Sequence, residues 1–244
     1  MYHPFSVAET IKTSWDIFKK NFVTIIVYSV IAFLLLGILG LIVGFMYSPT
    51  DFWWSMLVTF VLIWLQAYTT LGLYKLIFTL IDSEYYEFEF IQVIPKAKMV
   101  WSYLAVVFIF AFVITNLTIV IDYLENAGYE DLQFAVQVIS GLIGLYLALR
   151  IMFFNNFVVD DASGPIESLR QSFQLTKGYL LKVVLILGII ILLIALPAKL
   201  SQINPLISIA ILFTYPFVNI ILAVTYRKLI YSHQDVDDDI AETN

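Results

Sequence analysis

The stretch from Asn21 to Thr50, NFVTIIVYSVIAFLLLGILGLIVGFMYSPT, contains no Asp, Glu, Lys or Arg. An α-helix rises about 1.5 Å per residue, so about twenty apolar residues cross the hydrocarbon core of a bilayer. Backbone groups inside a bilayer must find their hydrogen-bond partners within the segment itself. The stretch therefore predicts a transmembrane helix.

Five more runs without charged residues follow along the chain. They are Phe52 to Tyr74, Met99 to Ile121, Leu132 to Leu149, Val183 to Ala198 and Ser201 to Tyr226. The run at Val183 is short, but Lys182 can lay its apolar stem along lipid, which extends the span toward Gly178. The runs lack the alternating polarity of strands in a membrane barrel. We therefore expect an all-α membrane protein with six transmembrane helices.

The composition points to lipid as the main solvent of the chain. Of its 244 residues, 61% are apolar and only 13% are charged, whereas soluble domains carry about 25% charged residues. A net charge of −6 argues against a basic surface that binds nucleic acid. Cysteine is absent, and His3 and His233 have no partner at metal-ligand spacing. We expect no metal, no cofactor and no catalytic residue.

The basic residues predict the orientation. Twelve of the thirteen fall on one side of the six-span scheme, and Lys199 alone falls on the other. The twelve are Lys12, Lys19, Lys20, Lys75, Lys96, Lys98, Arg150, Arg170, Lys177, Lys182, Arg227 and Lys228. Loops rich in Lys and Arg face the cytoplasm. This predicts a multi-pass protein of a bacterial cytoplasmic (inner) membrane, with both termini in the cytoplasm.

The segments on the basic side suggest a threefold repeat. Val7 to Asn21, Tyr86 to Met99 and Pro165 to Gly178 each read as an amphipathic helix that leads into a span. The expected apolar face is Ile11, Trp15 and Phe18 in the first helix and Ile166, Leu169 and Phe173 in the third. A shift of 158 residues places Glu9, Ser14 and Lys19 on Glu167, Ser172 and Lys177.

The expected unit is one amphipathic helix at the inner leaflet followed by two spans. The units cover residues 6–81, 86–159 and 165–231 of a single membrane domain, 1–232, and an acidic tail follows at 233–244. Three units in one orientation predict a pseudo-threefold bundle about the membrane normal. The alternative is that any helix at the inner leaflet selects aromatic residues and lysine.

Two segments resemble a known family. Residues 150–178, RIMFFNNFVVDDASGPIESLRQSFQLTKG, lead from an aromatic span end through Val-Val-Asp to a Ser-Leu-x-x-Ser-x-x-Leu-Thr-x-Gly helix. The opening SWDIFKKNF, residues 14–22, is similar to the start of the same family. The family is a poorly characterised bacterial group related to the membrane domain of glycerophosphodiester phosphodiesterases. The resemblance implies a six-span, non-catalytic membrane module and carries over no catalytic residue.

Four polar residues within or beside the spans are candidates for a ligand or lipid-headgroup contact: Arg150, Asn155, Asn156 and Asn116. Arg150 lies near the inner end of the fourth span. A charged side chain in hydrocarbon costs free energy unless it contacts a polar partner or reaches water. Arg150 is interpreted either as an anion or headgroup contact or as a side chain that reaches the inner headgroups. The asparagines either bond neighbouring helices or line a substrate path. Asp160 and Asp161 are expected to cap the turn that follows them.

Three functions remain open at this stage. The first is a non-enzymatic membrane module that binds or scaffolds another membrane protein. The second is a transporter or lipid-handling protein with a polar site near Arg150. The third is a membrane enzyme, which the lack of catalytic motifs disfavours. Gly37, Gly40 and Gly44 permit close helix approach and are expected to pack internally, and Pro216 is expected to bend the sixth span.

Overall fold

The computed structural model describes residues 5–46, 51–82 and 90–242, and these ranges contain helices but no strand. The helices are α1 (Val7–Lys20), α2 (Phe22–Met46), α3 (Phe52–Asp82), η1 (Phe90–Val93), α4 (Ala97–Asn126), α5 (Glu130–Ile151), α6 (Phe154–Asp160), α7 (Pro165–Leu175), α8 (Leu180–Ser201), η2 (Pro205–Ala210) and α9 (Ile211–Glu242). The predicted all-α class is confirmed.

Six segments of the described chain are long and apolar enough to cross a membrane. They are Phe22–Met46, Phe52–Asp82, Ala97–Asn126, Glu130–Asp160, Leu180–Ser201 and Pro205–Ser232. Each overlaps one of the charge-free runs, so the predicted number of spans is confirmed by length and composition.

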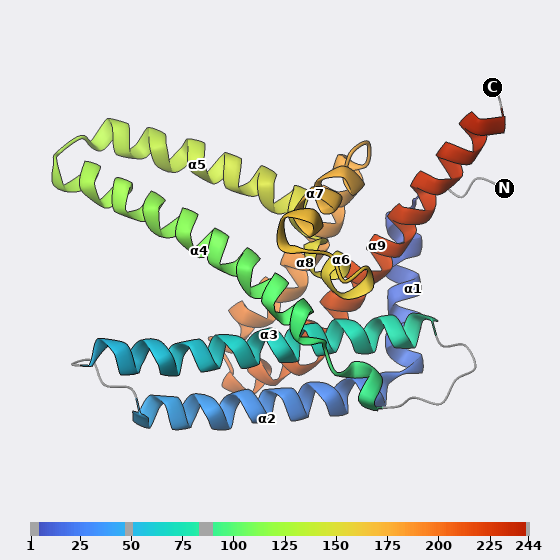
Figure 1. Ribbon diagram of the computed structural model, residues 1–244, viewed down its shortest axis with the longest axis horizontal. Coiled ribbons are helices and arrows are strands. Elements are labelled where there is room, and N and C mark those ends of the chain that lie inside the picture. The colour runs from blue at the N-terminus through green and yellow to red at the C-terminus, as the bar shows by residue number, and fades with distance from the viewer. Residues whose placement is uncertain (1–4, 47–50, 83–89, 243–244) are drawn as a thin grey trace.

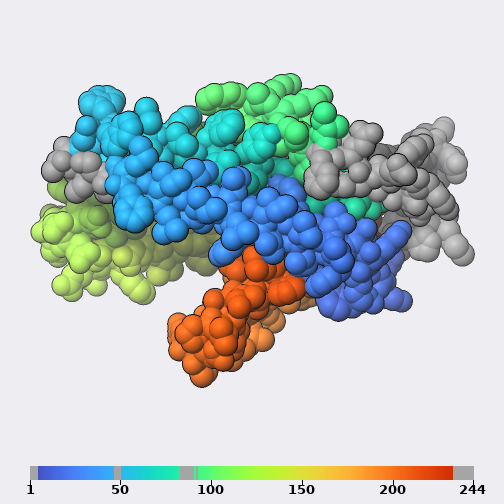
Figure 2. All heavy atoms as spheres, turned by 90° about the horizontal axis from the view of Figure 1, so that it is seen from below, coloured from blue at the N-terminus to red at the C-terminus, as the bar shows by residue number. Residues whose placement is uncertain are grey.

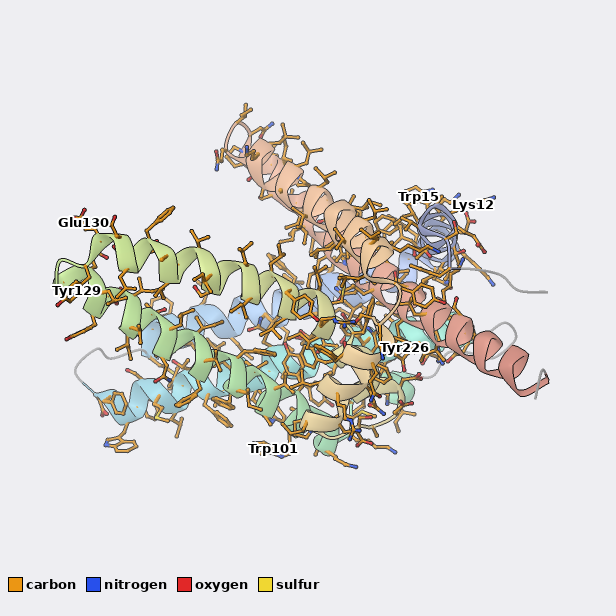
Figure 3. All side chains as sticks on the ribbon, turned by 90° about the horizontal axis from the view of Figure 1, so that it is seen from above. Lys12, Trp15, Trp101, Tyr129, Glu130 and Tyr226 are labelled. Atoms are coloured by element: carbon orange, nitrogen blue, oxygen red, sulfur yellow. The ribbon has the colours of Figure 1, made fainter. Side chains whose placement is uncertain are left out.

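The spans pair into helical hairpins, which we call arms. The arms are α2 with α3, α4 with α5, and α8 with α9. Figure 1 shows that the arms meet at one end of the molecule and spread apart at the other. We call the meeting end, with α1, η1, α6 and α7 packed on it, the hub. Tyr226 lies at the hub, whereas Tyr129 and Glu130 mark the free tip of the α4–α5 arm (Figure 3).

Burial is concentrated at the hub. The largest fully buried side chains are Tyr74, Tyr226, Phe153, Ile25, Leu71, Leu76, Ile77, Leu104, Ile186, Ile220, Ile221 and Leu229. By contrast, Leu149 at the hub end is the one buried residue of α5. The α8–α9 arm projects away from the α2–α3 arm in Figure 2. Lipid tails are as apolar as leucine, so exposed arms of this kind suit a bilayer.

The short helices of the hub join the arms in a regular order. Helix α1 packs against α9, η1 packs against α3, and α7 packs against α5 and α6. Thus η1 and α7, which each precede an arm, contact the second helix of the arm before it, and α1 contacts the last helix of the chain. The arms also touch directly, through α2 with α9, α3 with α4, and α5 with α8.

The prediction of an amphipathic helix from Tyr86 to Met99 is wrong for the residues of this segment that the structure describes. Residues 90–93 form the short 3-10 helix η1, and α4 begins only at Ala97. Pro95 lacks a backbone N–H and restricts the residue before it, which prevents a continuous helix. Residues 86–89 lie outside the described ranges.

The predicted apolar faces of α1 and α7 are only partly buried in the structure. Trp15 is 47% exposed and Ile166 is 65% exposed. The buried residues are Thr10, Ser14 and Phe18 in α1 and Ser168, Ser172 and Leu175 in α7. Small hydroxyl side chains allow these helices to approach the spans closely, and the Ser14 and Thr10 hydroxyls are satisfied by carbonyls one turn earlier, at Thr10 and Ser6.

One further expectation is corrected by the structure. A Cβ placed at Gly37, Gly40 or Gly44 would meet no atom within 4 Å among the described residues, so these glycines do not pack internally. Helix α9 continues to Glu242 and extends beyond the hub, so the described part of the expected acidic tail is helical (Figure 1). Pro216 lies inside α9.

Candidate functional site

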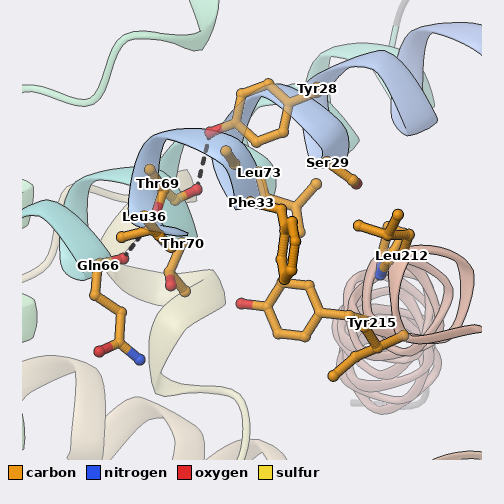
Figure 4. Close-up of a pocket in the computed structure, with 13 residues that line it drawn as sticks. Tyr28, Ser29, Phe33, Leu36, Gln66, Thr69, Thr70, Leu73, Leu212 and Tyr215 are labelled. Carbon is orange, nitrogen blue, oxygen red and sulfur yellow. Dashed lines mark hydrogen bonds between the residues drawn. The ribbon is translucent and has the colours of Figure 1, made fainter. Parts of the chain in front are cut away.

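Polar groups gather in a pocket between two arms. Helices α2 and α3 form one wall, and the first turns of α9 form the other. The pocket has a volume of about 210 Å³. Its lining residues are Tyr28, Ser29, Ala32, Phe33, Leu36, Gln66, Thr69, Thr70, Leu73, Ile211, Leu212, Tyr215 and Pro216 (Figure 4).

The walls of the pocket are held by a contact between Tyr28 and α3. The Tyr28 hydroxyl donates a hydrogen bond of 2.8 Å to the carbonyl oxygen of Thr69. This approach requires Gly72, because a Cβ at that position would overlap the Tyr28 hydroxyl. The side chain of Ser29 donates to the carbonyl of Ile25, one turn earlier in its own helix. Tyr28 and Ser29 thus enter an apolar span with their donors satisfied.

Other polar groups of the pocket have no such partner. Within the described ranges, the Gln66 amide, the Thr70 hydroxyl and the Tyr215 hydroxyl make no hydrogen bond to the protein. Figure 4 shows the Tyr215 hydroxyl directed from α9 toward the α3 side of the pocket, where Gln66 and Thr70 lie. An unsatisfied polar group in hydrocarbon costs several kcal/mol. The arrangement can therefore accept hydrogen-bonding atoms of a bound molecule.

A second cavity, of about 370 Å³, lies on another side of α9, against α8. Tyr215 and Ile211 line both cavities, so the first turns of α9 are loosely packed on two sides. Asn219 lines the second cavity, but its amide already donates to the Tyr215 carbonyl at 2.8 Å. This cavity is lined mostly by apolar side chains.

The predicted site residue Arg150 lies at the hub end of α5 and faces α7. Its guanidinium lies 4.3 Å from the centre of the Phe173 ring. Nη1 donates to Thr176 Oγ1 at 3.1 Å, and Nε donates to the Tyr146 hydroxyl at 3.2 Å. No carboxylate lies within ion-pair distance of Arg150 in the part of the chain that the structure describes. The positive charge of Arg150 is stabilised by the face of an aromatic ring and by neutral oxygen atoms.

The fourth span breaks directly after Arg150. Helix α5 ends at Ile151, and α6 begins at Phe154. The Ser172 side chain of α7 bridges the backbone groups on the two sides of this break. Its hydroxyl donates to the Arg150 carbonyl at 2.9 Å and accepts from the Phe153 N–H at 3.1 Å. The serine of the Ser-Leu-x-x-Ser motif thus supports the geometry of this site.

The three predicted asparagines lie in two different places. Asn155 and Asn156 lie in α6, and Asn156 is fully buried. Neither the amide nitrogen nor the amide oxygen of Asn156 has a hydrogen-bond partner among the described residues. Such orphan atoms commonly hold an internal water. Asn116 is remote from them, exposed on α4, and donates to the Phe112 carbonyl of its own helix at 2.7 Å.

A cluster of charges joins three elements at the hub. Asp160 at the end of α6 lies 3.1 Å from Arg227 of α9, which also lies 2.7 Å from Asp82 of α3. The Tyr226 hydroxyl donates to Asp160 at 2.9 Å. The expectation that Asp160 caps the following turn is therefore wrong. The N-cap of α7 is Gly164, whose N–H donates to the Glu167 carboxylate at 3.4 Å.

Asp161 is the neighbour of this cluster. Burial is the main cause that raises the pKa of its carboxyl above the ordinary 3.8, and the negative charges of Asp160 and Glu167 raise it further. Arg227 acts in the opposite direction and lowers that pKa. The carboxyl therefore takes up a proton more readily than a free aspartate does.

Sequence reasoning missed most of the pocket. It singled out neither Tyr28 nor Thr70 nor Tyr215. A signal does exist, since Tyr28-Ser29, Thr69-Thr70 and Thr214-Tyr215 place hydroxyl residues side by side inside otherwise apolar runs. A cluster of three or more His, Asp or Glu able to hold a metal ion is absent from the described residues.

No family model, curated protein or solved structure matches the chain. The family resemblance of residues 14–22 and 150–178 stays a prediction.

Proposed function

We propose that this chain is a non-enzymatic integral membrane module that binds a transmembrane helix of another membrane protein. The observation that carries the proposal is the open glycine face of α2. Gly37, Gly40 and Gly44 recur at helical spacing, and a Cβ at each would meet nothing within 4 Å. Small residues at membrane interfaces allow two backbones to approach closely. The chain itself leaves this face free for a partner.

The arms support this role by their separation. Phe33 and Leu41, which flank the glycine face, are 56% and 67% exposed. A helix that packs between spread arms would gain dispersion contacts on more than one side. The hub would hold the arms while their tips accommodate the partner.

We further propose the orientation and setting of the module. With the hub in the cytoplasm of a bacterial cell, the basic residues of the hub face the side that the charge rule requires. Trp15 and Trp101 would then lie near the inner interface and Trp53 near the outer one, and all three are exposed.

A threefold repeat is part of the same proposal. Its support is the order of contacts in the hub, where each short helix packs on the arm that precedes it in a closed ring. A second support is the pair of buried hydroxyls Thr10 and Ser14 in α1, which a shift of 158 residues places on the equally buried Ser168 and Ser172 in α7.

Purification from native membranes in a mild detergent tests the proposed function. We expect one discrete membrane protein to remain bound to the wild-type chain and to be lost from Gly40→Leu. Gly188→Leu on α8 is the matched control, because a Cβ there also meets nothing within 4 Å. A wild-type chain that purifies alone, or a Gly40→Leu chain with its partner intact, would refute the proposal. Recovery of further copies of this chain alone would replace it with self-association.

A second candidate function, the handling of an anionic lipid, is favoured by Arg150. Its positive charge has no carboxylate partner in the described ranges, and the side chain lies at the hub end of its span. Phosphate oxygens are natural partners for an arginine fork. Bound phosphatidylglycerol, counted by native mass spectrometry, should decrease in Arg150→Gln but not in Arg170→Gln, whose residue is exposed on α7. Equal binding by both variants would exclude this function.

A further inference from the structure

The pocket between α2, α3 and α9 lies at the depth of lipid tails. Gln66 is close to the midpoint of α3 (Phe52–Asp82). At 1.5 Å per residue it lies about 20 Å from either end of that helix. Water is scarce at this depth, so the pocket has to satisfy its polar groups by other means.

The chemistry of the lining excludes a charged ligand. None of the 13 lining residues is Asp, Glu, Lys, Arg or His. A phosphate or carboxylate group would lose its hydration without gaining a counter-charge, which is strongly unfavourable. The occupant of this pocket must be neutral.

The free polar groups define what the occupant must offer. The Thr70 and Tyr215 hydroxyls, which lack partners among the described residues, can donate to a carbonyl or ether oxygen. The Gln66 amide has both a donor and an acceptor, and its acceptor requires a hydroxyl or N–H on the ligand. A molecule with carbonyls alone would leave the amide oxygen unsatisfied.

The size and the rim of the pocket fit the polar end of a lipid. A volume of about 210 Å³ exceeds that of a single bridging water, about 30 Å³, several times over. Phe33 and Ile211 on the rim are 56% and 55% exposed, so the pocket can be reached from the surrounding hydrocarbon. An apolar chain can leave the pocket across Phe33, Leu36 and Leu212.

We propose that this pocket binds a neutral lipid whose polar end carries both a hydroxyl and a carbonyl, such as a diacylglycerol. Gln66, Thr70 and Tyr215 bind the polar end, and Tyr28 keeps α2 and α3 in place around it. The site lies apart from Arg150, and its rim residue Phe33 also flanks the α2 glycine face that is proposed to bind a partner.

A photoreactive dioleoylglycerol analogue in vesicles that contain the wild-type chain tests the site. We expect cross-links to peptides of α3 and of the first turns of α9. Unlabelled dioleoylglycerol should compete, whereas dioleoylphosphatidic acid, which is charged, and a quinone, which has carbonyls only, should not. Cross-links confined to other helices, or equal competition by phosphatidic acid, would overturn the proposal.

Single substitutions then assign the contacts. Gln66→Leu, Thr70→Val and Tyr215→Phe should each weaken dioleoylglycerol binding about fivefold, as expected for one lost hydrogen bond. The matched controls Gln137→Leu, Thr118→Val and Tyr123→Phe remove the same groups from the exposed α4–α5 arm and should leave binding unchanged.

A steric variant provides a second measurement if a polar variant fails to fold. Ala32→Trp should fill the pocket and abolish cross-linking without removing any polar group. Unchanged binding in Ala32→Trp and in the polar variants would overturn the site, because the lipid would then bind elsewhere.

Discussion

The hydroxyl of Tyr28 on α2 lies directly over Gly72 on α3, in the space that the Cβ of any other residue would occupy. It donates its hydrogen bond of 2.8 Å to the Thr69 carbonyl from this position. The glycine thus sets how closely the two helices of the first arm approach each other near the hub.

Gly72→Ala should lower the free energy of unfolding by about 1–3 kcal/mol, because the new methyl group forces the two helices apart. Unfolding in mixed micelles of dodecylmaltoside and dodecyl sulfate measures this change. The loss should be smaller in a Tyr28→Phe background, which removes the overlapping oxygen. Gly141→Ala on α5, where a Cβ meets nothing within 4 Å, is the control and should be neutral or slightly stabilising. A cost at both positions would mean that packing against Tyr28 is not the cause.

Ser172→Ala should destabilise the fold by about 1–3 kcal/mol, since it leaves the buried Phe153 N–H without its acceptor. The same unfolding measurement applies. Ser140→Ala removes a hydroxyl that bonds only within α5 and should have little effect. Equal stability of the two variants would show that the break between α5 and α6 needs no support from α7.

Asp160→Asn should cost about 1–3 kcal/mol, because it removes the charge that pairs with Arg227 across the hub. A fully buried pair costs about 3–5 kcal/mol to break, but these side chains are 20% and 23% exposed, so solvent screens part of the effect. Asp16→Asn breaks the exposed pair with Lys19 and should change stability by less than about 1 kcal/mol. Comparable losses in both would contradict a special role for the hub pair.

The raised pKa of Asp161 predicts a pH dependence of stability. Its folded pKa exceeds the ordinary 3.8, so the native state binds more protons than the unfolded state in the window above 3.8. The free energy of unfolding should therefore fall as the pH rises through this window. Asp161→Asn should reduce that fall, whereas Asp122→Asn at the exposed end of α4 should retain it. Identical pH profiles of the wild type and Asp161→Asn would refute the assignment.

Asn156→Leu should leave stability unchanged or raise it, because a leucine of similar volume removes two buried polar atoms that lack partners. A loss of more than about 1 kcal/mol would show that an internal water or a bound group satisfies this amide. Asn116→Leu is the control for the side-chain change, since Asn116 is exposed on the α4–α5 arm.

The site was only partly predictable from the sequence. Arg150 lies near the end of α5, and Asn155 and Asn156 lie in α6 on the other side of the break, whereas Asn116 belongs to the exposed arm. The partner of Asp160 could not be found from spacing, since Arg227 is 67 residues away in the chain. The pocket residues come from three helices, and nothing in any one helix indicates that Gln66 and Tyr215 share a space.

The sequence by itself determined the number, position and helical nature of the spans. Each charge-free run is a local property, and the cost of unpaired backbone groups in lipid leaves a helix as its one solution. The tertiary structure decided how the spans are arranged: that the arms spread from a hub, that α1 and α7 bury small hydroxyl side chains, and that the α2 glycines stay open. Lipid solvates the outside of a span as well as a neighbouring helix does, so apolar composition carries little information about which face packs. Which face of a span packs depends on close contacts between distant parts of the chain. Examples are Tyr28 against Gly72, and Ser172 at the break between α5 and α6.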